Sequence, residues 1–297
     1  MKPFFLIAFI ISFLLFTGCN NHPALELIAC GDDKVIIIDE SASNETDVKI
    51  LWSWQATEAA TQLPEIYQNY LSTIDECKPV DDGSNILITA SSGAVVLIER
   101  ATKKCLFYAH VPSAHSAAAL PGGRIAVALS TNPNGNRLDI YDRNQPEKVL
   151  YSDSLYSGHG AVWNVTRQRL YTLGYDNLRE YSLVNWETSS PSLKLEKKWT
   201  IPGIGGHDLS PVSSDKLLIT EHYGVHWFDL LNERFTPFEP LKEAANIKSV
   251  NYSEDSQQLI YTQAEESWWT FNIYLKNPDK TIHIPTIKLY KVRTSFD

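Results

Sequence analysis

"GGHDLSPVSSDKLLITEHYGVHWFDL", residues 205–230, contains the pattern that best indicates the fold. A short leading segment that begins at His207 precedes two runs rich in β-branched and aromatic residues, KLLITE (216–221) and VHWFDLL (225–231). Runs of this length and composition, separated by turn residues, are typical of a strand followed by a β-hairpin. The stretch therefore predicts a small antiparallel unit whose first strand begins beside a histidine.

The same arrangement recurs along the chain. Leading segments begin at or near five positions that carry an amine or an imidazole, namely Lys78, His115, His159, His207 and Lys248. The steps between them are 37, 44, 48 and 41 residues, and each segment precedes a hairpin. A four-stranded unit repeated at about 40 to 45 residues is typical of a β-propeller blade. The repeat predicts an all-β propeller.

The two ends of the repeat region complement each other. The first hairpin, ELIACGDDKVIIIDE (26–40), lacks a leading strand, whereas IKLYKVRTSF (287–296) is one strand more than the last blade needs. If the C-terminal strand becomes the innermost strand of the first blade, the ring closes without a long exposed edge. This predicts a six-bladed propeller as one domain at 26–297, with seven blades as the alternative and a partly helical insertion at 56–74.

The first residues, MKPFFLIAFIISFLLFTGC, predict export. Residues 1–18 have the lysine, the short apolar run and the small residue of a signal peptide. The ending LFTGC resembles the lipobox of bacterial lipoproteins, which implies that Cys19 is lipidated and that residues 19–25 form a tether. We expect a monomer in the cell envelope, held at a bacterial membrane by that lipid only, with secretion of a cleaved chain and an uncleaved anchor as alternatives.

Composition excludes some partners and chemistries. The net charge of −9 argues against nucleic acid as a partner, because nonspecific binding to nucleic acid needs a basic face. Cys30, Cys77 and Cys105 show no CxxC spacing, so they are expected to be buried thiols rather than zinc ligands.

Two longer stretches carry a family resemblance. The phrases HGAVWNVTRQRLYTLGYDNLREYSL (159–183) and GGHDLSPVSSDKLLIT (205–220) resemble an uncharacterised family of secreted bacterial six-bladed propeller proteins and lipoproteins. The resemblance covers nearly the whole exported chain. It implies the fold and brings no activity with it.

The repeated position predicts a site at one mouth of the channel. The innermost strand of a propeller blade lines the central channel, so Lys78, His115, His159, His207 and Lys248 are expected to form a ring there. The C-terminal strand is expected to add Lys291 or Arg293, and Trp163 is expected to line the wall. Such a cationic, imidazole-rich funnel would favour anions. A Gly-His pair also precedes the inner strand of Trp-Asp propeller repeats, where the histidine is structural, so a structural role stays open for His159 and His207.

Three chemistries fit this ring. His115, His159 and His207 could hold a divalent metal ion. Alternatively, lysines could neutralise a substrate carboxylate while a histidine removes a proton, as in a lyase that cleaves uronate oligosaccharides by β-elimination. The ring resembles the channel histidines of oligogalacturonate-degrading propeller lyases in placement. The third possibility, which we favour, is binding of an anionic glycan or a partner protein without catalysis. Glycoside hydrolysis by Glu76 and Asp208 is not expected, because their strand phase differs from that of the ring.

Overall fold

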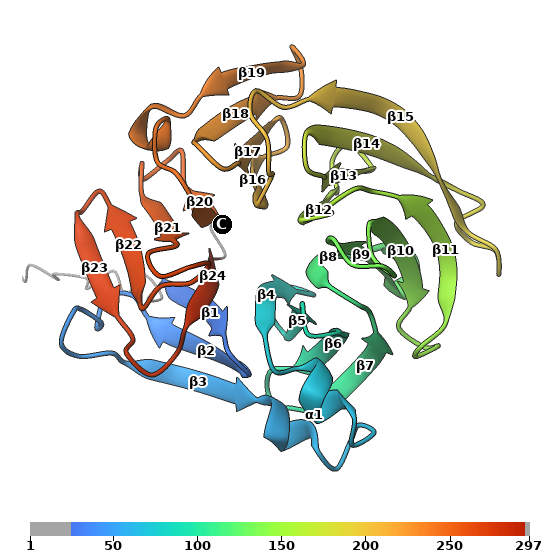
Figure 1. The fold of residues 1–297 in the computed structure, drawn as a ribbon, viewed down its shortest axis with the longest axis horizontal. Coiled ribbons are helices and arrows are strands. Elements are labelled where there is room, and N and C mark those ends of the chain that lie inside the picture. The colour runs from blue at the N-terminus through green and yellow to red at the C-terminus, as the bar shows by residue number, and fades with distance from the viewer. Residues whose placement is uncertain (1–24, 295–297) are drawn as a thin grey trace, which may run out of the picture.

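The protein is a six-bladed β-propeller, as the repeat predicts. The computed structural model describes residues 25–294, and within that range six antiparallel sheets of four strands each surround a central channel (Figure 1). The predicted signal peptide, Cys19 and most of the predicted tether lie outside the described residues.

Blade 1 is built from both ends of the described chain. Its strands, from the channel outwards, are β24 (Leu289–Thr294), β1 (Glu26–Gly31), β2 (Lys34–Asp39) and β3 (Ile50–Gln55). Antiparallel pairing of Leu27 with Thr294 and of Gly31 with Leu289 joins the ends. The C-terminal strand thus closes the ring, and the prediction of closure is confirmed.

The other blades follow one another in the sequence, each from an inner to an outer strand. Blade 2 contains β4 (Ile74–Val80), β5 (Asn85–Ala90), β6 (Ala94–Glu99) and β7 (Cys105–His110). Blade 3 contains β8 (Ala114–Leu120), β9 (Arg124–Leu129), β10 (Arg137–Asp142) and β11 (Val149–Ser154). Blade 4 contains β12 (Gly160–Asn164), β13 (Arg169–Leu173), β14 (Asn177–Val184) and β15 (Ser192–Thr200).

The last two blades complete the ring. Blade 5 contains β16 (Asp208–Ser213), β17 (Lys216–Thr220), β18 (Val225–Asp229) and β19 (Arg234–Pro237). Blade 6 contains β20 (Ile247–Tyr252), β21 (Leu259–Gln263), β22 (Asn272–Lys276) and β23 (Lys280–His283). Short helices lie in the connections: η1 (Ala56–Ala59), α1 (Tyr67–Tyr70), η2 (Pro121–Gly123) and η3 (Glu239–Leu241).

The core lies between adjacent blades because strand residues alternate between the two faces of each sheet. In β5, Ile86 and Ile88 pack against blade 1, whereas Leu87 packs against blade 3. All six residues of this strand are buried, which explains its continuous apolar sequence. Cys30 and Cys77 are free thiols within the same core.

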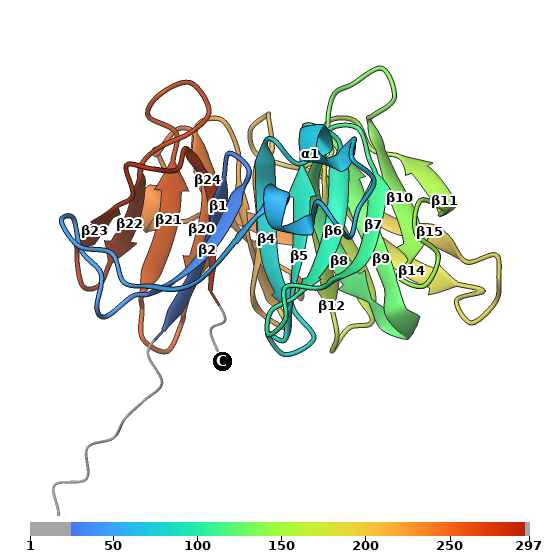
Figure 2. The ribbon, with the colours of Figure 1, turned by 90° about the horizontal axis from the view of Figure 1, so that it is seen from below.

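The two faces of the propeller differ in what they carry. In Figure 2, α1 lies on one face, and the two ends of the described chain lie on the other. The loop before each inner strand lies on the α1 face. Each inner strand therefore begins on that face. No helix within residues 25–294 is long and apolar enough to cross a membrane.

Candidate functional site

One residue from each blade forms a ring at the channel mouth on the α1 face. In four inner strands this residue is the extra one at a β-bulge: Asp75, His115, Lys248 and Tyr290. In blades 4 and 5 it is the histidine directly before the strand, His159 or His207, whose N–H still donates to the neighbouring strand. A bulge turns an extra side chain away from the ladder, here towards the channel.

The three histidines contact one another. The ring centroids of His115 and His159 lie 4.4 Å apart, and those of His159 and His207 lie 5.6 Å apart. Tyr290 completes the group from across the channel, 6.4 Å from His115. The structure therefore brings the three predicted histidines together at the mouth.

The hydrogen bonds of two imidazoles fix their tautomers. Nδ1 of His115 lies 2.9 Å from the carbonyl oxygen of Ser113, and Nδ1 of His159 lies 2.9 Å from that of Ser157. A carbonyl oxygen only accepts, so Nδ1 carries a proton in both rings, and in the neutral tautomer Nε2 is the acceptor. Burial, reinforced by the other histidines, holds the pKa of His159 well below its usual value, so this ring is neutral at physiological pH.

Lys248 is the exceptional charge of the ring. Its side chain is only 6% exposed, and Nζ lies 3.1 Å from Nε2 of His207. Within the described residues no carboxylate forms an ion pair with it. Burial lowers the pKa of Lys248 to about 8, with a further contribution from Lys291, so the amine is still mostly protonated at neutral pH. The same desolvation and the Lys248 charge lower the pKa of His207 to about 2, and His207 accepts the hydrogen bond as a neutral ring.

Deeper in the channel the charges are paired. Arg293 donates to both Glu76 and Asp208, with its closest contacts at 2.7 and 2.6 Å. Lys291 Nζ lies 3.0 Å from Asp208 and 3.4 Å from Glu76. Because of these cations the pKa of both buried carboxyls is lowered even though burial acts in the opposite direction. Lys78 Nζ also lies 3.6 Å from Glu76, so three cations surround two carboxylates in the channel below the ring.

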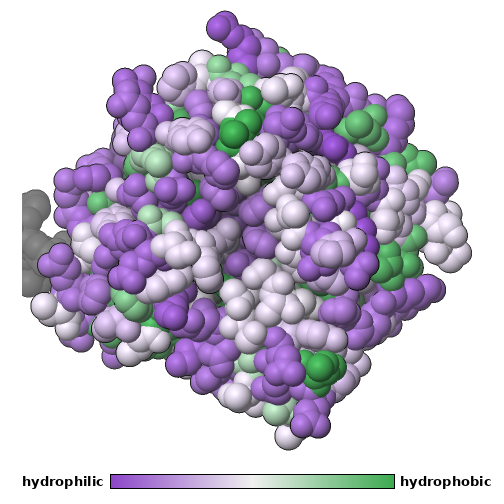
Figure 3. Space-filling model, in the orientation of Figure 1, coloured by the Kyte–Doolittle hydropathy of each residue, from purple (hydrophilic) through white to green (hydrophobic). Residues whose placement is uncertain are grey.

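A cavity of about 450 Å³ opens above the ring. Asp75, His115, His207, Lys248, Trp268 and Tyr290 line it together with Thr73, Ser91 and Ser92. Figure 3 shows the corresponding hollow at the centre of the α1 face, lined mainly by hydrophilic residues. Trp268 stands at its edge with 55% of its surface exposed. The cavity thus combines a buried cation, two imidazoles and an exposed aromatic ring.

The prediction that Lys78 and Lys291 or Arg293 belong to the ring is wrong. Asp75, not Lys78, is the blade 2 member of the ring, and Lys78 lies farther along the channel, where Nζ donates to Ser116 Oγ at 3.0 Å. Tyr290 is the blade 1 member, while Lys291 and Arg293 belong to the deeper cluster. The funnel is consequently less cationic than expected.

Trp163 does not line the mouth. It lies near the far end of β12 and packs against the core between blades 3 and 4. The tryptophan at the mouth is Trp268. It comes from the loop between β21 and β22, and that loop folds over the channel.

Asp75, Tyr290 and the channel positions of Glu76 and Asp208 were not predicted from the sequence. The pKa of Asp75 is raised by burial, and Ser91 N–H donates to its carboxylate. Their positions follow from the strand pairing in the structure, which places Glu76 opposite Thr89 and Asp208 opposite Thr220. A bulge of one residue shifts that register and is invisible in a residue count.

A metal site at the three histidines finds no support in the arrangement of ligands. In residues 25–294, no group of three or more histidine, cysteine or acidic side chains is arranged to hold a metal ion.

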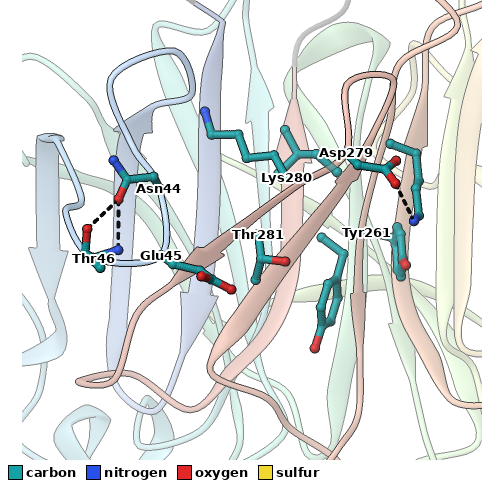
Figure 4. Close-up of a pocket in the computed structure, with 10 residues that line it drawn as sticks. Asn44, Glu45, Thr46, Tyr261, Asp279, Lys280 and Thr281 are labelled. Carbon is teal, nitrogen blue, oxygen red and sulfur yellow. Dashed lines mark hydrogen bonds and ion pairs between the residues drawn. The ribbon is translucent and has the colours of Figure 1, made fainter.

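A second pocket is larger but chemically ordinary. Figure 4 shows this groove of about 590 Å³ between blades 1 and 6, with Glu45 and Thr46 opposite Thr281 and Tyr261. Its lysines are compensated: Lys276 pairs with Asp279 at 3.3 Å, and Lys280 pairs with Glu40 at 2.9 Å. The channel mouth, with its uncompensated cation, is the stronger candidate site.

Comparison with known proteins supports the fold and leaves the chemistry open. A solved structure described as "a protein of unknown function from Bacteroides caccae" superimposes with a TM-score of 0.60 at 12% identity, covering 92% of this chain and 100% of that one. At that identity the likeness concerns the fold alone. No curated protein matches the chain significantly. Residues 24–297 match the family described as "Family of unknown function (DUF6528)", and the chain belongs to this family.

Proposed function

We propose that the channel mouth binds an acidic sugar and that the protein recognises an anionic glycan. The observation that carries the proposal is Lys248, a buried ammonium group with no carboxylate partner among the described residues. Taking an ion out of water costs several kcal/mol unless a partner compensates it. A carboxylate of the ligand would supply that partner inside the cavity.

The other groups of the mouth suit a sugar. The neutral form of His115 presents Nε2 to the cavity as an acceptor for sugar hydroxyls, and Asp75 offers carboxylate oxygens. The exposed face of Trp268 can stack on the apolar face of a pyranose ring. Asp75 also limits the positive charge of the cavity, which favours a single carboxylate over a multiply charged phosphate.

The test compares glucuronic acid with glucose, which has a hydroxymethyl group in place of the carboxylate. We expect glucuronic acid to bind in isothermal titration calorimetry and glucose to bind at least tenfold more weakly. K248M should abolish the difference, whereas K242M, at an exposed lysine paired with Glu239, should keep it. Equal binding of the two sugars, or unchanged binding by K248M, would show that Lys248 does not recognise a carboxylate.

A uronate lyase is the second candidate, favoured by the neutral imidazoles beside a buried ammonium. Lys248 would neutralise the carboxylate, and Nε2 of His115 would take the proton from the adjacent carbon. The electron pair forms a carbon–carbon double bond, the glycosidic C–O bond breaks, and the departing oxygen takes a proton from the Tyr290 hydroxyl. Polygalacturonate and alginate should then yield ultraviolet absorbance from an unsaturated product. No absorbance from either polymer, with glucuronic acid still bound, would leave binding as the function.

Export and anchoring through Cys19 form the last element of the proposal. The described chain starts and ends on the face opposite the mouth, since Leu27 pairs with Thr294 there. A lipid near the N-terminus would therefore attach the protein with its mouth directed away from the membrane. In that orientation a glycan from outside could reach the site.

A further inference from the structure

A row of aromatic rings leads away from the channel mouth across blades 5 and 4. The ring of His207 at the mouth lies 5.0 Å from that of His222, which lies 6.3 Å from Tyr175, which in turn lies 5.6 Å from Tyr156. Tyr223 flanks His222 at 5.9 Å. We call His222, Tyr175, Tyr156 and Tyr223 the aromatic track.

The track is on the surface and on the same face as the cavity. Its residues come from the loops before β12, between β13 and β14, and between β17 and β18, which all open onto the α1 face. Tyr156 is 55% exposed and Tyr223 is 66% exposed. His222 and Tyr175 between them are half-buried. Large aromatic side chains usually bury most of their surface, so a connected row with two exposed members favours a ligand.

The double glycine before His207 holds the track in place. Gly205 has a φ of +70°, and a Cβ atom there would lie 2.0 Å from Nε2 of His222. The His222 ring therefore packs directly on the glycine backbone. Gly206 N–H donates to the carbonyl oxygen of Tyr175 at 3.1 Å, which fixes the neighbouring loop. The glycines thus position two track residues.

We infer that the aromatic track extends the channel-mouth site into a binding cleft for an oligosaccharide, in which an acidic sugar sits at Lys248 and further sugar units stack along the track. The inference rests on the proposed function, because the acidic sugar at Lys248 fixes the position of the oligosaccharide along the track. Successive rings along the track lie 5.0–6.3 Å apart and are inclined to one another by 34–90°, so the track offers both ring faces and ring edges. Asp176 follows Tyr175 and is exposed, so the sugars on the track are neutral ones.

A glycan fits these observations better than a protein partner. The track is one ring wide and ends in a cavity that holds a single buried cation. A stable protein interface needs a broad patch of about 800 Å² on each partner with an apolar centre. A sugar chain, by contrast, needs only a row of rings with polar edges, which tyrosines and a histidine provide.

The test measures affinity against chain length by isothermal titration calorimetry. The probes are glucuronic acid and aldouronic acids in which glucuronic acid is joined to xylose chains of increasing length. Each added xylose should strengthen binding about fivefold until the track is filled. The variant Y156A/Y223A should bind glucuronic acid as the wild type does and lose most of the gain from the longer chains. L231A, at an exposed leucine in the turn after β18, is the matched control.

The outcomes separate the two proposals. If glucuronic acid binds and the added xylose units bring no gain, the track does not bind sugars and this inference is wrong while the proposed function stands. If the double variant keeps the length dependence, the inference is equally wrong. If no acidic sugar of any length binds, the proposed function itself fails and the inference falls with it. Circular dichroism and melting curves of both variants verify that the fold is intact.

Discussion

The substitution K248M should make the protein more stable while it removes ligand binding. Burial lowers the pKa of Lys248 from 10.5 to about 8. A pKa that falls by one pH unit corresponds to about 1.4 kcal/mol, so keeping this amine charged in the fold costs roughly 3 kcal/mol at pH 7. Methionine fills a similar volume without a charge. The substitution also removes the hydrogen bond from Lys248 to His207, which costs about 1 kcal/mol. The free energy of unfolding should therefore rise by about 2 kcal/mol.

The dependence on pH gives this prediction a second signature. The folded pKa lies below the unfolded one, so the cost of the ammonium is fully present below pH 8 and disappears as the pH rises towards 10.5. The advantage of K248M in urea unfolding should therefore be about 2 kcal/mol at pH 7, reach zero before pH 10.5 and become a disadvantage of about 1 kcal/mol at higher pH, where only the lost hydrogen bond to His207 counts. K291M, which removes one partner of the buried ion pair with Asp208, should instead lose about 3 kcal/mol at pH 7. A K248M protein less stable than the wild type would contradict this expectation, because it would make Lys248 a structural residue.

Further predictions concern binding, the cluster, the track and the anchor. Glucuronic acid should bind with constant affinity below pH 7 and about tenfold more weakly for each pH unit above 8, as Lys248 loses its proton; constant calorimetric affinity up to pH 10 would contradict this. R293M should lower the free energy of unfolding by about 3–5 kcal/mol, since two buried carboxylates lose their main partner, and urea titration measures the loss. G205A should displace the His222 ring and lower stability by about 1–3 kcal/mol, because an L side chain is strained at that φ and meets the imidazole; an unchanged melting curve would speak against this packing. C19S should move the exported protein from the membrane to the soluble fraction, and equal membrane fractions would exclude lipid anchoring.

The fold was predictable because its signals are local and repeated. Runs such as KLLIT in β17 and NILITA in β5 carry the β-branched composition of buried strands, and each ends at a turn. The surplus strand at the C-terminus then indicated how the ring closes. Closure itself is a pairing over the whole chain, but only one arrangement leaves no strand without a partner.

The site was predictable only in part, because side-chain direction near the channel depends on bulges. His115, His159 and His207 share a sequence position and do meet at the mouth. In blades 1 and 2, counting to the nearest amine selected Lys291 and Lys78, whereas the bulges turn Tyr290 and Asp75 to the mouth. One extra residue changes which side chain faces the channel, and the amino-acid composition of a strand does not predict where a bulge occurs.

The way blade 1 is assembled also imposes an order in time. Lys288 N–H donates to Asp32, which lies 256 positions earlier in the sequence. Blade 1 therefore cannot be completed until the last strand has been synthesised. At the usual rate of about 5–20 residues per second that delay is roughly 13 to 50 seconds. During it, Glu76 and Asp208 lack the cations of β24 that neutralise them in the finished channel. A chain without its final strand therefore has an open sheet edge, an Asp208 carboxylate without an ion-pair partner and a Glu76 carboxylate with Lys78 alone, which makes it a target for chaperones and proteases.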